Sequence, residues 1–145
     1  MHETLERAQR LLDPAAECGS AELVTDLSGE LLPDWYDDWV VLEQERFRQL
    51  RLHALEVLCE RLTAARRFGA AVEAGVAAVA AEPLRESAQR VLMFAYIAEG
   101  NACEAIRQYR AYRHTLNKEL GLEPSQLVRD LLHTIPEAAL THAGV

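Results

Sequence analysis

Apolar and small side chains recur in this chain at a spacing of 34 residues. Each member of a first set is followed 34 positions later by a second residue: Leu58 by Leu92, Cys59 by Met93, Leu62 by Tyr96, and Ala71 by Ala105. A period of this length is typical of a helix–turn–helix unit, which cannot bury its apolar face alone and must stack on a neighbour. The spacing therefore restricts the chain to an array of helix pairs in which each unit covers the next.

A period of 34 residues is that of the tetratricopeptide repeat, and it predicts an all-α fold. We expect tetratricopeptide-like antiparallel helix hairpins, stacked into a right-handed array with a long central helix. Pro33 and Asp34 suit the start of that helix, and nothing interrupts it from Tyr36 to about Ala65. Further helices are expected at 4–12, 21–27, 70–81, 86–99, 102–120 and 125–134.

The 145 residues fit a single domain. Within it we expect N-terminal helices in residues 1–30, a repeat-like helical core in 34–135 and a tail in 136–145.

Gly121 is placed to cap the helix that ends at Leu120, with Pro124 shortly after it.

Several residues are assigned to packing within the array. Ala71 and Ala105 are expected where two helices touch most closely, because a small side chain allows that approach. Pro83 ends a helix and sets the angle into the next repeat. Gly75 stands where the larger Tyr109 stands one repeat later. The other repeat positions assigned to packing are Leu58, Leu92 and Tyr96.

Trp35 and Trp39 lie four residues apart at the start of the long helix. That spacing places both on one side of the helix. We assign them an internal packing role, and the alternative is that they anchor a partner.

Charge is distributed unevenly along the chain. The net charge is −8, which disfavours autonomous binding to a phosphate backbone. Residues 1–45 hold twelve Asp or Glu against two Arg, a net of −10, whereas residues 46–145 hold thirteen Arg or Lys against eleven acids, a net of +2. The three cysteines form neither a disulfide framework nor a zinc pattern, which favours a reducing cytoplasm. No signal core or membrane-spanning run is present in the sequence.

The sequence offers no pattern of catalytic or metal-ligating residues. The five histidines are scattered, and His53 and Cys59 fall on different faces of a helix. The acids Asp37 and Asp38 are assigned to the positive end of a helix dipole. No nucleophile–base pair, phosphate loop or calcium loop is present. We therefore expect neither an enzyme nor a bound metal or cofactor.

Basic residues recur at helical spacing in 102–120. Arg107, Arg110 and Arg113, with His114 beside them, form a basic stripe that Lys118 extends. One interpretation is a solvated helix face. The other is a docking stripe for an acidic protein surface, or for DNA already held by an attached domain.

A second candidate contact surface is the open face of the repeats. That face is expected to include His53, Glu56, Glu60, Thr63, Ser87, Arg90, Phe94 and Ile97. Phe94 and Ile97 are apolar, so either another part of the domain covers them or they mark a dimer or partner site. Arg90, Phe94 and Ile97 therefore join the three arginines as candidate partner-binding residues.

Three segments resemble the bacterial transcriptional activator domain in combination. They are residues 31–40 (LLPDWYDDWV) leading into Glu43, residues 82–86 (EPLRE), and 105–110 (AIRQYR) followed by 119–125 (ELGLEPS). In the Streptomyces antibiotic regulatory protein family this domain follows a winged-helix DNA-binding domain. The resemblance implies an all-α fold of tetratricopeptide-like hairpins. It also implies transcription activation by contact with a second protomer, RNA polymerase or a sigma factor.

The sequence contains no winged-helix domain, so we expect either a piece of a longer regulator or a stand-alone version. DNA recognition is then supplied elsewhere. The rival function is a stand-alone tetratricopeptide-like adaptor unrelated to transcription, and an enzyme is a remote third.

Overall fold

The computed structural model describes residues 38–138, with side chains from Val41 onward. The helices expected at 4–12 and 21–27, all of Trp35, the side chain of Trp39 and the end of the tail lie outside the described residues. Within them the chain is helical and contains no strand.

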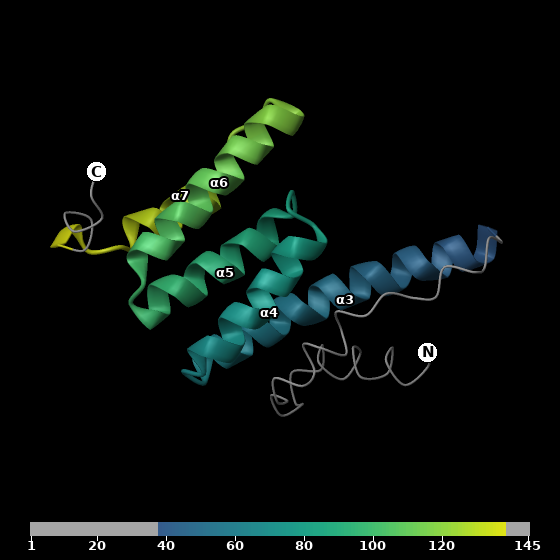
Figure 1. Cartoon of the computed structure of the whole chain (residues 1–145), viewed down its shortest axis with the longest axis horizontal. Helices are drawn as coiled ribbons and strands as arrows, with labels where there is room; N and C mark the ends of the chain where they lie inside the picture. Colours follow the sequence, from purple (N-terminus) through teal and green to yellow (C-terminus); the bar gives the residue numbers. More distant parts are fainter. Residues whose placement is uncertain (1–37, 139–145) are drawn as a thin grey trace.

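Five helices are described: α3 (Asp38–Ala64), α4 (Phe68–Ala81), α5 (Glu86–Glu99), α6 (Ala102–Leu120) and α7 (Gln126–His133). Consecutive helices run antiparallel, as Figure 1 shows. The predicted all-α, tetratricopeptide-like fold is confirmed. The bounds of α5 and α6 are those expected from the sequence, whereas α4 begins two residues before the predicted Ala70.

Left-handed residues end three of the helices. Gly100 has φ 94° and Gly121 has φ 64°, a conformation that glycine adopts without strain. Beyond α5 the Gly100 and Asn101 N–H groups donate to carbonyls of the last turn. After α3 the left-handed position is held by Arg66, with φ 61°. These local stops produce the short connections that fold each helix back on its predecessor.

The core lies where α4 packs against α3 and α5. Leu58 and Leu92, which are related by the repeat, are both fully buried there. Ala71 and Gly75 are buried on the facing side of α4. A β-carbon on Gly75 would lie 3.0 Å from Leu92 Cδ1 and 3.2 Å from Cys59 Sγ. The absence of a side chain at Gly75 therefore lets α4 approach both neighbours closely.

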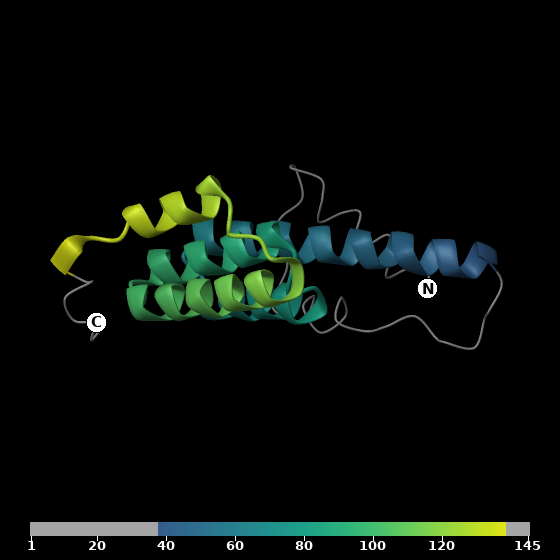
Figure 2. The ribbon, with the colours of Figure 1, turned by 90° about the horizontal axis from the view of Figure 1, so that it is seen from above.

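Helix α5 packs against each of the other four described helices. Figure 2 shows α6 on one side of α5 and α7 on the other. The first half of α3 extends beyond α4, and Leu42 there is 70% exposed. Pro83 lies in the connection between α4 and α5, where its carbonyl accepts a hydrogen bond from the Gln89 side chain at 2.9 Å. Among the described helices α6 packs mainly against α5, and a series of exposed residues runs along its length.

Candidate functional site

Helix α6 presents basic side chains to solvent along most of its length. Four exposed residues lie on one side of the helix, and we call them the basic ridge: Arg107, Arg110, His114 and Lys118. The opposite side of α6 buries Ala105, Tyr112 and Leu116. Because apolar and basic residues are separated around the helix, packing of the apolar side turns the ridge outward.

The ridge keeps most of its charge unneutralised. Arg107 Nη1 donates to Glu104 Oε1 at 2.8 Å, but both side chains are well exposed, and such pairs contribute little. Among the described residues, Arg110, His114 and Lys118 make no ion pair. The ridge can therefore attract an acidic surface over several ångströms of water.

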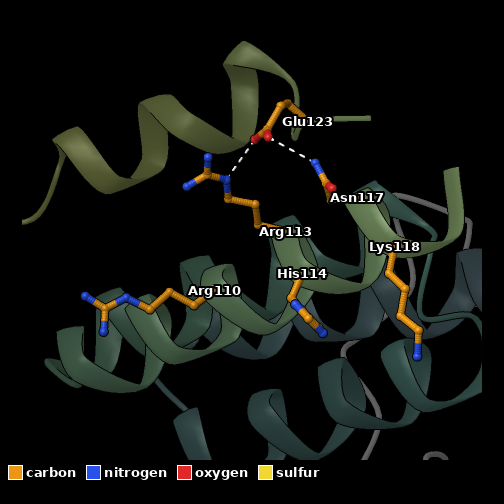
Figure 3. A pocket seen from close by; sticks show the side chains of 6 residues that line it. All are labelled: Arg110, Arg113, His114, Asn117, Lys118 and Glu123. Carbon is orange, nitrogen blue, oxygen red and sulfur yellow. Dashed lines mark hydrogen bonds and ion pairs between the residues drawn. The ribbon is translucent and has the colours of Figure 1, made fainter. Parts of the chain in front are cut away.

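Arg113 points to a different side of α6 from the ridge. Its Nε donates to Glu123 Oε2 at 2.8 Å, and Asn117 Nδ2 donates to Glu123 Oε1 at 3.3 Å (Figure 3). The hydrogen bond from Arg113 lowers the pKa of Glu123 and, in return, the pKa of Arg113 is raised. The pair joins α6 to the connection before α7. Of the three predicted stripe residues, the structure thus places Arg107 and Arg110 on the ridge and Arg113 beside it.

An open hollow of about 390 Å³ is lined by Arg110, Arg113, His114, Asn117, Lys118 and Glu123. In Figure 3, His114 and Lys118 point away from Glu123, and Arg110 extends along the helix. The side chains diverge and do not close around a volume. Small-molecule sites enclose most of their ligand, so this arrangement suits contact with a macromolecular surface.

The outer side of α4 differs in charge from that of α6. The exposed residues of α4 are Gly69, Glu73, Val76 and Ala80, and the helix holds no Arg or Lys. The two helices occupy equivalent places in their repeats. The basic ridge is therefore specific to the second repeat.

The predicted residues on α5 form a separate surface. Phe94 is 49% exposed, and Arg90 and Ile97 are half-buried one turn to either side of it. Phe94 is therefore about half open to solvent. Within the described range, no hydrogen bond or ion pair joins these three residues to the arginines of α6.

The expected open face of the repeats is wrong at two positions. Glu56 is only 6% exposed, because it accepts hydrogen bonds from Arg85 Nε and, at 2.8 Å, from Ser87 Oγ. Thr63 is also buried, and its hydroxyl donates to the Cys59 carbonyl at 2.8 Å. Since Glu56 and Arg85 are 29 residues apart, no local pattern indicates that they meet.

A second polar cluster that the sequence did not reveal surrounds Glu86. Its Oε2 accepts from Tyr112 Oη at 3.0 Å and from the Ser125 N–H at 3.2 Å. Burial acts to raise the pKa of Glu86, but the hydrogen bonds from Ser125 and Tyr112 leave it lowered. Burial, with the Glu86 bond, raises the pKa of Tyr112. The cluster ties α5, α6 and the start of α7 together and so supports the ridge from beneath.

The described part of the chain contains no group of three or more His, Cys, Asp or Glu that could hold a metal ion. None of its helices is long and apolar enough to cross a membrane.

Comparison with known proteins gives one family. The model of the bacterial transcriptional activator domain matches residues 1–136. Among curated proteins, none matches the chain.

Proposed function

The chain belongs to the bacterial transcriptional activator domain family, and on that premise we propose that it regulates transcription by contacting another protein through the basic ridge of α6. DNA binding is assigned to an attached or separate domain, because a net charge of −8 disfavours binding to phosphates. The chain acts in the cytoplasm and has no catalytic role in this proposal.

The observation that carries the proposal is the ridge itself. Arginine is enriched at protein interfaces, and a basic surface speeds association with an acidic one. Arg107, Arg110 and Lys118 present such a surface over several turns of one rigid helix. The expected partner is an acidic surface of RNA polymerase, a sigma factor or a second copy of the chain.

Two further sets of residues belong to the proposed contact, one beside the ridge and one on the separate surface of α5. Arg113 borders the ridge, and its exposed pair with Glu123 can open at little cost to join a contact. Arg90, Phe94 and Ile97 provide a half-apolar second contact on α5. An exposed aromatic ring flanked by an arginine is the composition expected at the centre of an interface.

The test measures binding of the full chain to purified RNA polymerase, with and without sigma factor, after nuclease treatment. The variant combines Arg107→Glu, Arg110→Glu and Arg113→Glu. The matched control, Arg46→Glu with Arg67→Glu and Arg129→Glu, reverses three exposed arginines elsewhere. We expect the triple variant to bind roughly tenfold or more weakly, about 1.4 kcal/mol, and the control to bind as the unaltered chain does.

Circular dichroism must show the same helix content in all three proteins. Unchanged affinity of the folded triple variant would favour the alternative interpretation, in which the stripe is a solvated helix face without a partner. Capture of other proteins from a host lysate, with no polymerase subunit, would favour the adaptor unrelated to transcription.

A further inference from the structure

Glu123 is the single acid among the described residues that line the hollow beside α6. The other lining residues can all donate a hydrogen bond, and they are Arg110, Arg113, His114, Asn117 and Lys118. In Figure 3 the Glu123 carboxylate lies between the side chains of Arg113 and Asn117 and accepts from both. The chain therefore already binds one carboxylate at this basic surface, and that contact indicates which chemical group the surface recognises.

We propose that Arg113 and Asn117 form a binding site for a carboxylate side chain of the acidic partner, and that Glu123 occupies this site until the partner displaces it. The ligand is an Asp or Glu side chain in an acidic peptide segment. The displacement by a partner rests on the function proposed above, whereas the recognition of a carboxylate does not.

The bonds that hold Glu123 leave room for a stronger ligand. Arg113 uses only its Nε, at 2.8 Å, and the bond from Asn117 is long, at 3.3 Å. Within residues 38–138 the two terminal nitrogens of Arg113 donate to no other residue. A carboxylate that meets two parallel N–H groups of a guanidinium is bound more strongly than one that meets a single N–H. A partner carboxylate on the terminal nitrogens of Arg113 can therefore outcompete Glu123.

The partner and Glu123 compete because they need the same cation. The pKa of Glu123 is lowered mainly by the hydrogen bond from Arg113, so the charge of Glu123 depends on that guanidinium. Two carboxylates beside one guanidinium repel each other, and the repulsion disfavours the charged form of both. Binding of a second carboxylate to Arg113 thus weakens the bond to the first.

The backbone on either side of Glu123 is held without help from its carboxylate. The Gly121 N–H donates to the Asn117 carbonyl at 2.9 Å, and the Ser125 N–H donates to Glu86 Oε2 at 3.2 Å. Pro124, which follows Glu123, is fully buried. Because the pair of Arg113 with Glu123 is well exposed, opening it costs little. The Glu123 side chain can therefore leave Arg113 while the connection between α6 and α7 keeps its fold.

The test titrates the full chain at low salt with a blocked hexaglutamate peptide, and a blocked hexaglutamine peptide is the uncharged control. Nuclear magnetic resonance follows the side-chain Nε–H signal of Arg113. We expect this signal to shift with hexaglutamate and to stay unchanged with hexaglutamine. The Glu123→Gln variant should bind hexaglutamate about threefold more tightly than the unaltered chain, since the internal competitor is lost.

Two further variants separate competition at the site from a general change of charge. Glu119→Gln removes the same charge from an exposed residue of α6 that does not line the hollow, and it should give a clearly smaller gain in affinity. In an Arg113→Gln background, Glu123→Gln should give no gain beyond that of Glu119→Gln, because Glu123 no longer has a cation to occupy.

Three outcomes would overturn the proposal. The first is no shift of the Arg113 signal with hexaglutamate in either the unaltered chain or the Glu123→Gln variant. The second is unchanged or weaker binding by Glu123→Gln, which would make Glu123 a residue that orients Arg113. The third is an equal gain from Glu119→Gln. None of these measurements contains polymerase, so a failure of the partner test and a failure of this site can be told apart.

Discussion

The two helix pairs, α3 with α4 and α5 with α6, share one 34-residue spacing but are built from different side chains. In the first pair, α4 buries Ala71, Ala74, Gly75 and Ala78, and close approach of the backbones makes the contact. In the second pair, α6 buries Ala105 but also Tyr112, whose hydroxyl needs and finds an acceptor in Glu86.

The solvent-facing sides of α4 and α6 also differ, in the charges that they carry. Glu73 is the one charged residue of α4, whereas α6 carries the basic ridge. The first pair therefore contributes most of the dry core. The second pair is held partly by hydrogen bonds such as that of Tyr112 with Glu86, and it presents charged side chains to solvent. One repeat period can thus serve two tasks, because it specifies the helix pairing and leaves the outward residues free.

The largest expected effect comes from enlarging the equivalent alanines. Ala71→Trp and Ala105→Trp each place a large ring at a fully buried site and should each lower the free energy of unfolding by about 3 kcal/mol or more. Urea unfolding followed by circular dichroism checks this. Ala71→Trp should be the worse of the two, because α4 is held closely on two sides. Unchanged midpoints in both variants would contradict the repeat packing.

Removing Arg85 tests the link between the two pairs. Arg85→Ala leaves the buried Glu56 carboxylate with Ser87 but without its guanidinium, and we expect a loss of about 2 kcal/mol. The loss should shrink when Glu56→Gln is added, since the neutral amide no longer needs the cation. A double-mutant cycle measures the coupling, and strict additivity would show that the pair contributes nothing.

Tyr112→Phe removes one hydrogen bond from Glu86 and should destabilise the chain by about 1.5 kcal/mol at pH 7. The pKa of Glu86 is lowered from its usual 4.5, so the unfolded chain binds the proton more readily. The stability from this carboxylate is present above that value and is lost as the pH falls through the folded pKa. The difference in unfolding free energy between the unaltered chain and the Tyr112→Phe variant should therefore become smaller as the pH falls. Urea midpoints between pH 7 and pH 3 measure it, and a constant gap would argue against the ionised acceptor.

Two glycines in α4 provide the finest comparison. Gly75→Ala should cost about 1 kcal/mol, because its methyl group meets Leu92 Cβ at 3.1 Å as well as Leu92 Cδ1. Gly69→Ala meets nothing within 4 Å and should stabilise by about 0.5 kcal/mol through the unfolded state. Thermal unfolding of the two variants side by side checks the sign. A Gly75→Ala variant as stable as Gly69→Ala would mean that the close approach of α4 is not needed.

Much of the fold could be predicted because its signals are local. The ends of α5 and α6 follow from Gly100 and Gly121, and a helix cap involves only the last few residues of its own helix. The burial of Leu58 and Leu92 follows from the period, which acts along the sequence. The candidate site was predicted only in part. The sequence placed Arg107 and Arg110 on one basic stripe, but it grouped Arg113 with them.

The sequence by itself determined that this chain forms paired helices, through its 34-residue period, and that α6 carries basic residues at helical spacing. Helix propensity and capping could be predicted as well, because they operate over one or two turns. Only the tertiary structure decided which charges remain available. In the folded chain Arg85 donates a hydrogen bond to Glu56, Arg113 donates one to Glu123, and Tyr112 donates one to Glu86. Those choices depend on how helices stack. A partner ten or thirty residues away is selected by the geometry of that stacking, on which a local pattern carries no information.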